Sequence, residues 1–331
     1  MKAPHFWSAG LDPKSREAAP VTRALLTPLA MLYTWGIRNK LARAQPAKVQ
    51  IPVVCVGNLT VGGVGKTPIV AAIRAHLSGK GLHAASLSRG YGGSQIGPEK
   101  IYPDWHTASM CGDEPLMLSR TGESWIGQDR LAAVNEMTLA GVKAVVMDDG
   151  HQNPSIEKTL SLVVIDAAAP FGNGHVLPKG PLREPVGDGL ARADGVILMG
   201  TGNIPAEVTA SGLPVLRAQL VPAAPPPEGP LVAFAGIGRP VKFFDDLKAQ
   251  GADLREAIGY PDHHAYTQKD LKFLHRVAED HGARLITTSK DHVRLEADDQ
   301  ERILEYPVRV EFEDISRLDA LLQPVLNPVA S

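Results

Sequence analysis

Short apolar runs alternate with helical patterns along most of the chain. Apolar runs that end at glycine, proline or acidic residues predict buried strands at residues 51–56, 83–88, 143–149, 162–166, 195–199 and 215–220. Patterns typical of helices occur between them, at residues 69–77 and 129–140. Because strands alternate with helices, we expect an α/β fold with a mostly parallel sheet covered on both faces.

A proline-rich segment at residues 222–230 interrupts this pattern and predicts a stiff linker. A second α/β unit follows, with strands expected at residues 231–235 and 284–288 and helices at residues 241–250 and 267–281, the last capped by Thr267. We therefore expect four parts: an N-terminal segment at residues 1–46, a core domain at 47–221, the linker at 222–230 and a smaller α/β domain at 231–331.

An apolar stretch at residues 24–37 precedes the core and is followed by basic residues. As a helix it would be about 21 Å long, which is shorter than the ~30 Å hydrocarbon core of a membrane. Its polar side chains, Arg23, Thr27, Thr34 and Arg38, fall on one side. This pattern favours a helix in the interface of an anionic membrane, with the basic residues toward the lipid headgroups. The alternative is a helix packed on the protein's own core.

The segment after the first expected strand has the composition of a phosphate-binding loop. Glycines at 62, 63 and 65 precede Lys66 and Thr67, and a helix then opens with Pro68 in its first turn. Glycines let backbone N–H groups converge on an anion, and the helix N-terminus attracts negative charge. Lys66 is expected to reach the β- and γ-phosphates, and Thr67 to ligate Mg²⁺. The usual pattern of such loops has glycine where this chain has Thr60. The expected phosphate-binding residues are Thr60, Val61, Gly62, Gly63, Val64, Gly65, Lys66 and Thr67.

Carboxylates and arginines follow other expected strands. Asp148 and Asp149 end an apolar run, as expected for residues that carry carboxylates to the Mg²⁺ of a nucleotide. Arg89 follows another strand, and Arg183 could clamp a phosphate beside Glu184, although the last two could equally form a surface ion pair. Asp113 lies at an expected helix start, where local sequence alone favours an N-cap.

Composition limits the class of protein. The chain has 331 residues, 44% of them hydrophobic, enough to bury the cores of two domains. Its formal net charge of −2 argues against a general nucleic-acid binder. Its two cysteines are too few for a disulfide scaffold, so a reducing compartment fits best. No sequence feature indicates an obligate protein partner.

Together these motifs resemble the tetraacyldisaccharide 4′-kinase family, the lipid A 4′-kinases of Gram-negative bacteria. The matching segments follow in order along residues 20–300: Gly57-Asn58 through Thr67-Pro68, Ser88-Arg89-Gly90-Tyr91, Gly112-Asp113-Glu114-Pro115, Asp148-Asp149-Gly150, Gly180-Pro181-Leu182-Arg183-Glu184, Asp262-His263 and Lys290-Asp291.

The resemblance implies a kinase that transfers the γ-phosphate of ATP to the 4′-hydroxyl of a tetraacylated glucosamine disaccharide. It implies ATP and Mg²⁺ as cofactors, a glycolipid substrate, and a location at the cytoplasmic face of the bacterial inner membrane. In such enzymes Asp113 would be the catalytic base paired with His263, and Asp148 and Asp149 would manage Mg²⁺. The acceptor and its phosphates would be bound by Arg89, Glu114, Asn153, Arg183 and Glu184.

One departure from the family pattern, the choice between two histidines and two rival functions remain open. The family often has Phe-Gln-His after Asp-Asp-Gly, whereas this chain has His151-Gln152-Asn153, and the adjacent His264 leaves the partner of Asp113 undecided. The rival is a membrane-associated switch ATPase of the partitioning or division-site type. Those proteins carry a lysine just before the first of the loop glycines, where this chain has Val61. A GTP-dependent metal chaperone is less favoured, because no guanine-specificity motif occurs.

Overall fold

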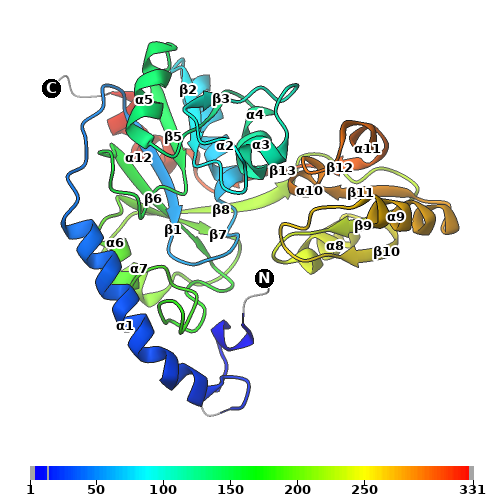
Figure 1. Ribbon diagram of the computed structural model, residues 1–331, viewed down its shortest axis with the longest axis horizontal. Helices are drawn as coiled ribbons and strands as arrows, with labels where there is room; N and C mark the ends of the chain where they lie inside the picture. Colours follow the sequence, from blue (N-terminus) through cyan, green and yellow to red (C-terminus); the bar gives the residue numbers. More distant parts are fainter. Residues whose placement is uncertain (1–3, 13–14, 328–331) are drawn as a thin grey trace.

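The computed structural model describes residues 4–12 and 15–327. Their strands form one nine-stranded sheet and one four-stranded sheet. The smaller sheet and its helices project to one side of the larger unit, and the long helix α1 (Pro20–Ala42) lies along the opposite flank (Figure 1). The expected α/β fold with a mostly parallel sheet is confirmed.

The large sheet has the order β13-β8-β7-β6-β1-β5-β2-β4-β3. Its central strand β1 pairs in parallel with β5 and β6, and only the edge strands β3 and β13 run antiparallel to their neighbours. All six residues of β1 are buried, which explains the unbroken apolar run. The strands are β1 (Val53–Asn58), β2 (Ala84–Ser88), β3 (Glu99–Lys100), β4 (Ser124–Ile126), β5 (Ala144–Asp148), β6 (Leu160–Asp166), β7 (Gly195–Met199), β8 (Val215–Pro222) and β13 (Val308–Phe312).

Helices cover both faces of this sheet. One face packs against α2 (Lys66–Gly79), α4 (Asp113–Ser119) and α12 (Ile315–Leu326). The other face packs against α5 (Arg130–Leu139), α6 (Val186–Leu190) and α7 (Ala206–Ser211). The short helices η1 (His5–Trp7) and α3 (Ala108–Cys111) complete this unit.

The small unit is a parallel sheet of order β10-β9-β11-β12 with helices of its own. Thr267 caps α9 through a capping box with Asp270, as the sequence predicted. The elements are β9 (Pro230–Ala235), α8 (Pro240–Ala249), β10 (Asp253–Gly259), α9 (Gln268–Asp280), β11 (Arg284–Thr288), α10 (Ser289–His292), α11 (Ala297–Arg302) and β12 (Leu304–Tyr306).

The structure differs from the expected domain boundaries at the C-terminal end. Beyond Pro307 the chain returns to the large unit, where β13 pairs with β8 and α12 buries Leu318, Leu322 and Val325 in the core. The small unit therefore ends near residue 306 instead of 331. The chain therefore crosses between the units twice, in the expected linker and again at Pro307. The two crossings lie side by side, because the Ala223 amide donates to the Pro307 carbonyl over 2.9 Å.

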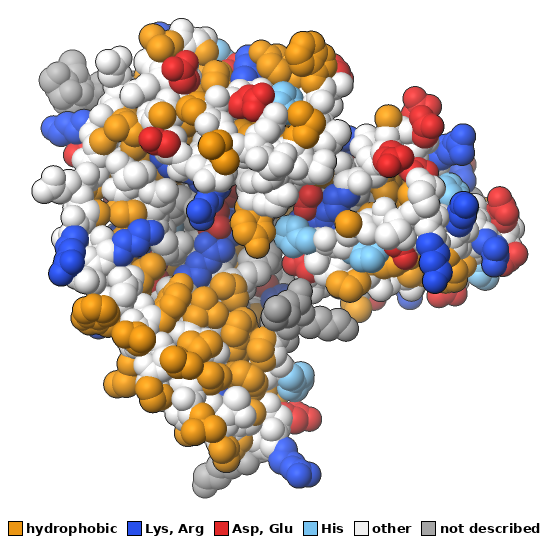
Figure 2. Space-filling view, in the orientation of Figure 1, with side chains coloured by type: hydrophobic (Ala, Val, Ile, Leu, Met, Phe, Trp, Pro, Cys, Tyr) orange, Lys and Arg blue, Asp and Glu red, His pale blue; other side chains and the backbone are white. Residues whose placement is uncertain are grey.

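Helix α1 turns its apolar side away from the protein. Leu25, Met31 and Trp35 are 74%, 69% and 64% exposed, and the only buried residue of the helix is Ala30. Apolar side chains form a broad surface over the lower part of the molecule in Figure 2. The alternative in which these side chains pack on the protein's own core is therefore wrong.

The polar side of α1 faces the large unit, which corrects the expected orientation toward lipid headgroups. Arg38 forms an ion pair with Asp188, Nε to Oδ2, at 2.6 Å, and Arg23 Nη2 lies 2.8 Å from His175 Nε2. These contacts bond the two basic residues to the large unit, while the apolar side chains of the helix remain outward. Among the described helices, none is both long enough and apolar enough to span a membrane.

We predict that α12 contributes to the stability of the large unit although it lies beyond the small one. Leu322 is fully buried, so Leu322→Ala should lower the free energy of unfolding by about 2–5 kcal/mol in a urea titration. Leu139→Ala, at a side chain that is 82% exposed, is the matched control and should change it by less than about 0.5 kcal/mol. Equal effects of the two substitutions would contradict this packing.

Candidate functional site

The phosphate-binding loop connects the central strand β1 to helix α2. Gly62 and Gly65 have φ angles of 110° and 86°, a backbone region that side chains with a Cβ rarely adopt. The loop is fastened to residues 181–183, because the Val61 amide donates to the Pro181 carbonyl over 2.8 Å and Thr60 forms a β-bridge with Leu182. Thr60 is not among the residues with positive φ, so glycine is not needed at this position.

Lys66 is nearly buried at the first turn of α2. Its Nζ donates to Asn58 Oδ1 over 3.1 Å and lies 3.7 Å from Asp149 Oδ1. Asn58 is fully buried at the end of β1, and its Nδ2 donates to the Thr60 carbonyl over 2.6 Å. Asn58 therefore orients both the lysine and the loop. Sequence reasoning gave it no role, although a buried amide at the end of an apolar strand was the available signal.

Asp148 ends β5 beside the phosphate-binding loop. Its Oδ2 accepts a hydrogen bond from Thr67 Oγ1 over 3.0 Å, and its Oδ1 is buried without a partner among the described residues. Burial and the negative charge of Glu114 raise the pKa of Asp148 to about 7, against the opposing effect of Lys66. A divalent cation at this oxygen would supply the missing partner.

The donor set fits Mg²⁺ bound together with phosphates. No group of three His, Cys, Asp or Glu side chains among the described residues forms a complete cage. Mg²⁺ is usually held by one or two carboxylates, phosphate oxygens and waters, so a complete cage is not required. Asp148 and Thr67 are the residues that would hold the ion.

Asp149 points to a different set of partners. It has a φ angle of 56° just after β5, and its Oδ1 accepts a hydrogen bond from Arg183 Nη1 over 2.7 Å. Burial alone would raise the pKa of Asp149, but the charges of Lys66 and Arg183 outweigh it and lower the pKa. The two aspartates thus have distinct environments, one beside Thr67 and the other between two cations.

Asp113 lies where the two units meet. It begins α4, but the N-cap is Gly112, and Asp113 Oδ2 instead accepts hydrogen bonds from His263 Nδ1 (2.9 Å) and from Arg294 Nε and Nη2 (2.9 and 2.7 Å). Burial would raise the pKa of Asp113, but these bonds and charges outweigh it and lower the pKa to about 2. Arg294 belongs to no motif that the sequence analysis used.

The structure distinguishes the two adjacent histidines. His263 contacts Asp113, whereas His264 stacks on Tyr260 with ring centroids 4.6 Å apart and lies 3.1 Å from Asp270. His264 therefore supports the loop that carries His263.

The remaining residues expected to bind the acceptor differ in burial and in their partners. Glu184 is fully buried, forms an ion pair with Arg192 at 2.6 Å and accepts from Gln152 Nε2 over 2.8 Å. The expected contact of Glu184 with the acceptor is therefore wrong, because both its oxygens bind protein groups inside the fold. Asn153 Oδ1 accepts from the Ser155 amide, Arg89 is exposed on its loop, and Glu114 is half-buried close enough to Asp148 to raise its pKa.

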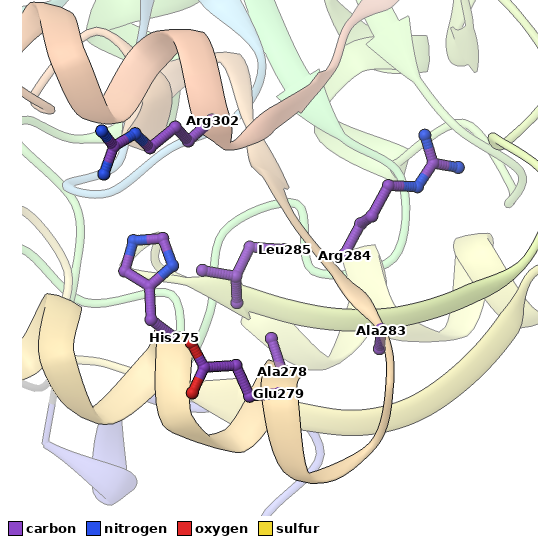
Figure 3. A pocket seen from close by; sticks show the side chains of 7 residues that line it. All are labelled: His275, Ala278, Glu279, Ala283, Arg284, Leu285 and Arg302. Carbon is purple, nitrogen blue, oxygen red and sulfur yellow. The ribbon is translucent and has the colours of Figure 1, made fainter.

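Two hollows lie elsewhere on the described surface. One, of about 350 Å³, is on the small unit between α9, β11 and α11, with His275 and Arg302 near each other and the Arg284 side chain pointing away (Figure 3). It contains none of the site residues above. The other, of about 640 Å³, lies between α1 and residues 174–186 and is lined by Thr27, Ala30 and Val176 among others.

Comparisons with known proteins identify the family. The family model described as Tetraacyldisaccharide-1-P 4'-kinase matches residues 22–327. A relative from Hyphomonas neptunium named Tetraacyldisaccharide 4'-kinase is 62% identical over 99% of this chain and 98% of its own length. A relative of the same name from Maricaulis maris is 49% identical over 99% of this chain and 97% of its own length.

A solved structure supports the fold independently. The crystal structure of LpxK from Aquifex aeolicus in complex with ATP has a TM-score of 0.72 and 24% sequence identity, covering 92% of this chain and 99% of that one. The match of the family model over nearly the whole chain, together with these relatives, shows that the protein belongs to the tetraacyldisaccharide 4'-kinase family.

Proposed function

We propose that this kinase transfers the γ-phosphate of ATP to the 4′-hydroxyl of a tetraacylated glucosamine disaccharide lipid, at the cytoplasmic face of the inner membrane. The observation that carries the proposal is the Asp113–His263 pair at the edge of a phosphate-binding site. The helix that begins with Asp113 also carries Glu114, whose charge acts on Asp148. A carboxylate at this edge can accept the proton of an attacking hydroxyl, which transfer of a phosphoryl group to an alcohol uses.

On the phosphate side, the loop and Lys66 bind and orient the nucleotide. The backbone N–H groups of residues 62–67 would donate to the phosphates, and Lys66 would exchange its bond to Asn58 for the β- and γ-phosphate oxygens. Mg²⁺ at Thr67 and Asp148 would neutralise charge on these oxygens. Arg183, held by Asp149 over 2.7 Å, is a second cation available to a phosphate.

On the acceptor side, Asp113 accepts the proton of the attacking hydroxyl. A loose phosphoryl-transfer transition state needs proton removal only late, so a carboxylate of low pKa is adequate as the base. His263 orients this carboxylate through Nδ1. Arg89, on the loop after β2, and Glu114, in the first turn of α4, are proposed to contact the disaccharide or its phosphates.

The outward apolar side of α1 supports binding to the membrane that holds the lipid substrate. Side chains such as Leu29, Leu32 and Trp35 would enter the interface while Arg23 and Arg38 remain bonded to the large unit. The basic residues beyond them, Lys40 and Arg43, are exposed and available to anionic headgroups.

The switch-ATPase alternative lacks support. Those proteins require a lysine where this chain has Val61, and the chain matches the kinase family over residues 22–327. The distinguishing observation is whether ATP turnover depends on a lipid acceptor.

We predict label transfer from γ-labelled ATP to a tetraacylated disaccharide lipid presented in mixed micelles, and none to the same lipid blocked at its 4′-hydroxyl. Lys66→Ala should lower the rate by about 10²–10³-fold, because a charged phosphate contact is lost. Lys242→Ala, at an exposed position of α8, is the matched control and should retain the rate. ATP hydrolysis that proceeds equally without the lipid would overturn the proposal.

We also predict that Asp113 and His263 act as a unit. Asp113→Ala should cause the largest loss of turnover, His263→Ala a smaller loss, and the double variant little more than Asp113→Ala. His264→Ala should lower thermal stability more than turnover, because His264 packs between Tyr260 and Tyr266. Losses that add in the logarithm of the rate would mean independent roles.

A third prediction concerns α1. Replacing Leu29 and Leu32 by Asp should weaken binding to anionic vesicles by about 100-fold in a sedimentation assay and leave the melting temperature unchanged. The control places Asp at Leu139 and Phe273, which are also exposed but lie on other elements. If the α1 variant binds as the wild type does, α1 does not anchor the protein.

A further inference from the structure

Arg294 is a buried arginine at the junction of the two units. It follows α10, its side chain is 6% exposed, and its guanidinium contacts elements of both units. Nε and Nη2 donate to Asp113 Oδ2 in the large unit, whereas Nη1 donates over 2.9 Å to the Gly236 carbonyl and to Asp291 Oδ1 in the small unit.

Asp291 holds this guanidinium in place. It is fully buried, its Oδ1 accepts from the Gly236 amide and from Tyr266 Oη, both over 2.9 Å, and its Oδ2 accepts from Thr288 Oγ1 over 2.7 Å. A carboxylate fixed by three neutral donors presents a rigid anion to Arg294. The planar guanidinium donates from three nitrogens, whereas a lysine ammonium donates from a single nitrogen and cannot reach all of these acceptors in the same geometry.

The contacts orient the carboxylate of Asp113. His263 Nε2 lies 3.1 Å from Lys290 Nζ, and an ammonium can only donate, so the hydrogen of the imidazole is assigned to Nδ1, which donates to Asp113. The side-chain hydrogen bonds from His263 and Arg294 all end on Oδ2 of Asp113. Oδ1 is therefore the oxygen available to an incoming hydroxyl.

We infer that Arg294 is a positioning residue for the phosphoryl transfer: it fixes the Asp113 carboxylate through Oδ2, directs Oδ1 to the acceptor hydroxyl, and couples this orientation to docking of the small unit. The inference rests on the proposed function, in which Asp113 is the base.

The charges around Asp113 determine how removal of Arg294 changes the orientation and the pKa of its carboxyl group. The small unit presents Arg294 and His263, with Asp291, Lys290 and Asp262 behind them, and α4 itself contributes Glu114. Without Arg294, Asp113 loses two of its three donors and its strongest counter-charge. The carboxylate then rotates more freely, and its pKa rises.

The kinetic test compares Arg294→Met, Arg294→Lys and Arg239→Met. Arg239 is the matched control, because its 2.7 Å ion pair with Asp166 also joins the two units but is exposed and does not involve Asp113. We expect Arg294→Met to lower kcat by about 100-fold with little change in KM for ATP, as for a misplaced catalytic group. Arg294→Lys should recover part of this loss, and Arg239→Met should retain kcat within about threefold.

The second readout is a titration of the Asp113 carboxyl by ¹³C NMR, which needs no lipid substrate. Removal of a guanidinium at this distance should raise the pKa of Asp113 by about 1–3 units in Arg294→Met, and in this variant the acidic limb of the pH–rate profile should move to higher pH. Arg294→Lys retains the charge and should keep the pKa low while kcat stays reduced, which separates orientation from charge. If Arg294→Met does not fold, Arg294→Lys alone tests the positioning role.

The two proposals fail in different ways. Absence of lipid phosphorylation by the wild type overturns the proposed function, and the titration still reports whether Arg294 governs Asp113. Unchanged kcat in Arg294→Met, or an equal loss in Arg239→Met, overturns the positioning role while leaving the kinase activity intact.

Discussion

A nearly buried ammonium at the end of the central strand sets the arrangement of the nucleotide site. A buried cation must have polar or anionic partners at all times, and Lys66 finds them in Asn58 and Asp149. Each partner is held in turn, Asn58 by Gln152 through its carbonyl and Asp149 by Arg183. Gln152 is itself fixed by the buried Glu184. Charged and amide side chains therefore form one network from the phosphate-binding loop to residues 183–192.

A second network of the same kind joins the two units. Asp113 comes from the large unit, and its three donor atoms come from the small unit. One is on His263, in the loop after β10, and two are on Arg294, which follows α10. Gly236, after β9, holds Arg294 through its carbonyl. The Asp113 carboxylate therefore has all three of these donors only when the small unit is docked on α4. The chain crosses between the units at residues 223–229 and again at 307, so the small unit is attached by two segments that lie side by side.

Helix α1 is arranged in the opposite way. Its polar residues bond to the large unit and its apolar residues remain outside, so water is the least favourable surrounding for the exposed side. The same helix borders the hollow of about 640 Å³ beside residues 174–186. Residues 181–182 of this segment also hold the phosphate-binding loop through Thr60 and Val61.

The sequence by itself determined the features that depend on local order along the chain. The α/β class, the strand–loop–helix at residues 53–79 and the aspartates after β5 all follow from apolar runs and glycines that act over a few residues. The ordered motifs identified the family and so paired Asp113 with a histidine 150 positions away.

Tertiary structure alone decided which of the two adjacent histidines contacts Asp113. The backbone of His263 has a φ of 58°, and the side chains of His263 and His264 point in different directions. It also decided that β13 and α12 belong to the large unit, that Glu184 is buried beside Arg192, and that Arg294 reaches Asp113. Each of these depends on contacts between residues far apart in the chain, and no pattern of neighbouring residues records which distant partner will neutralise a charge or complete a sheet edge.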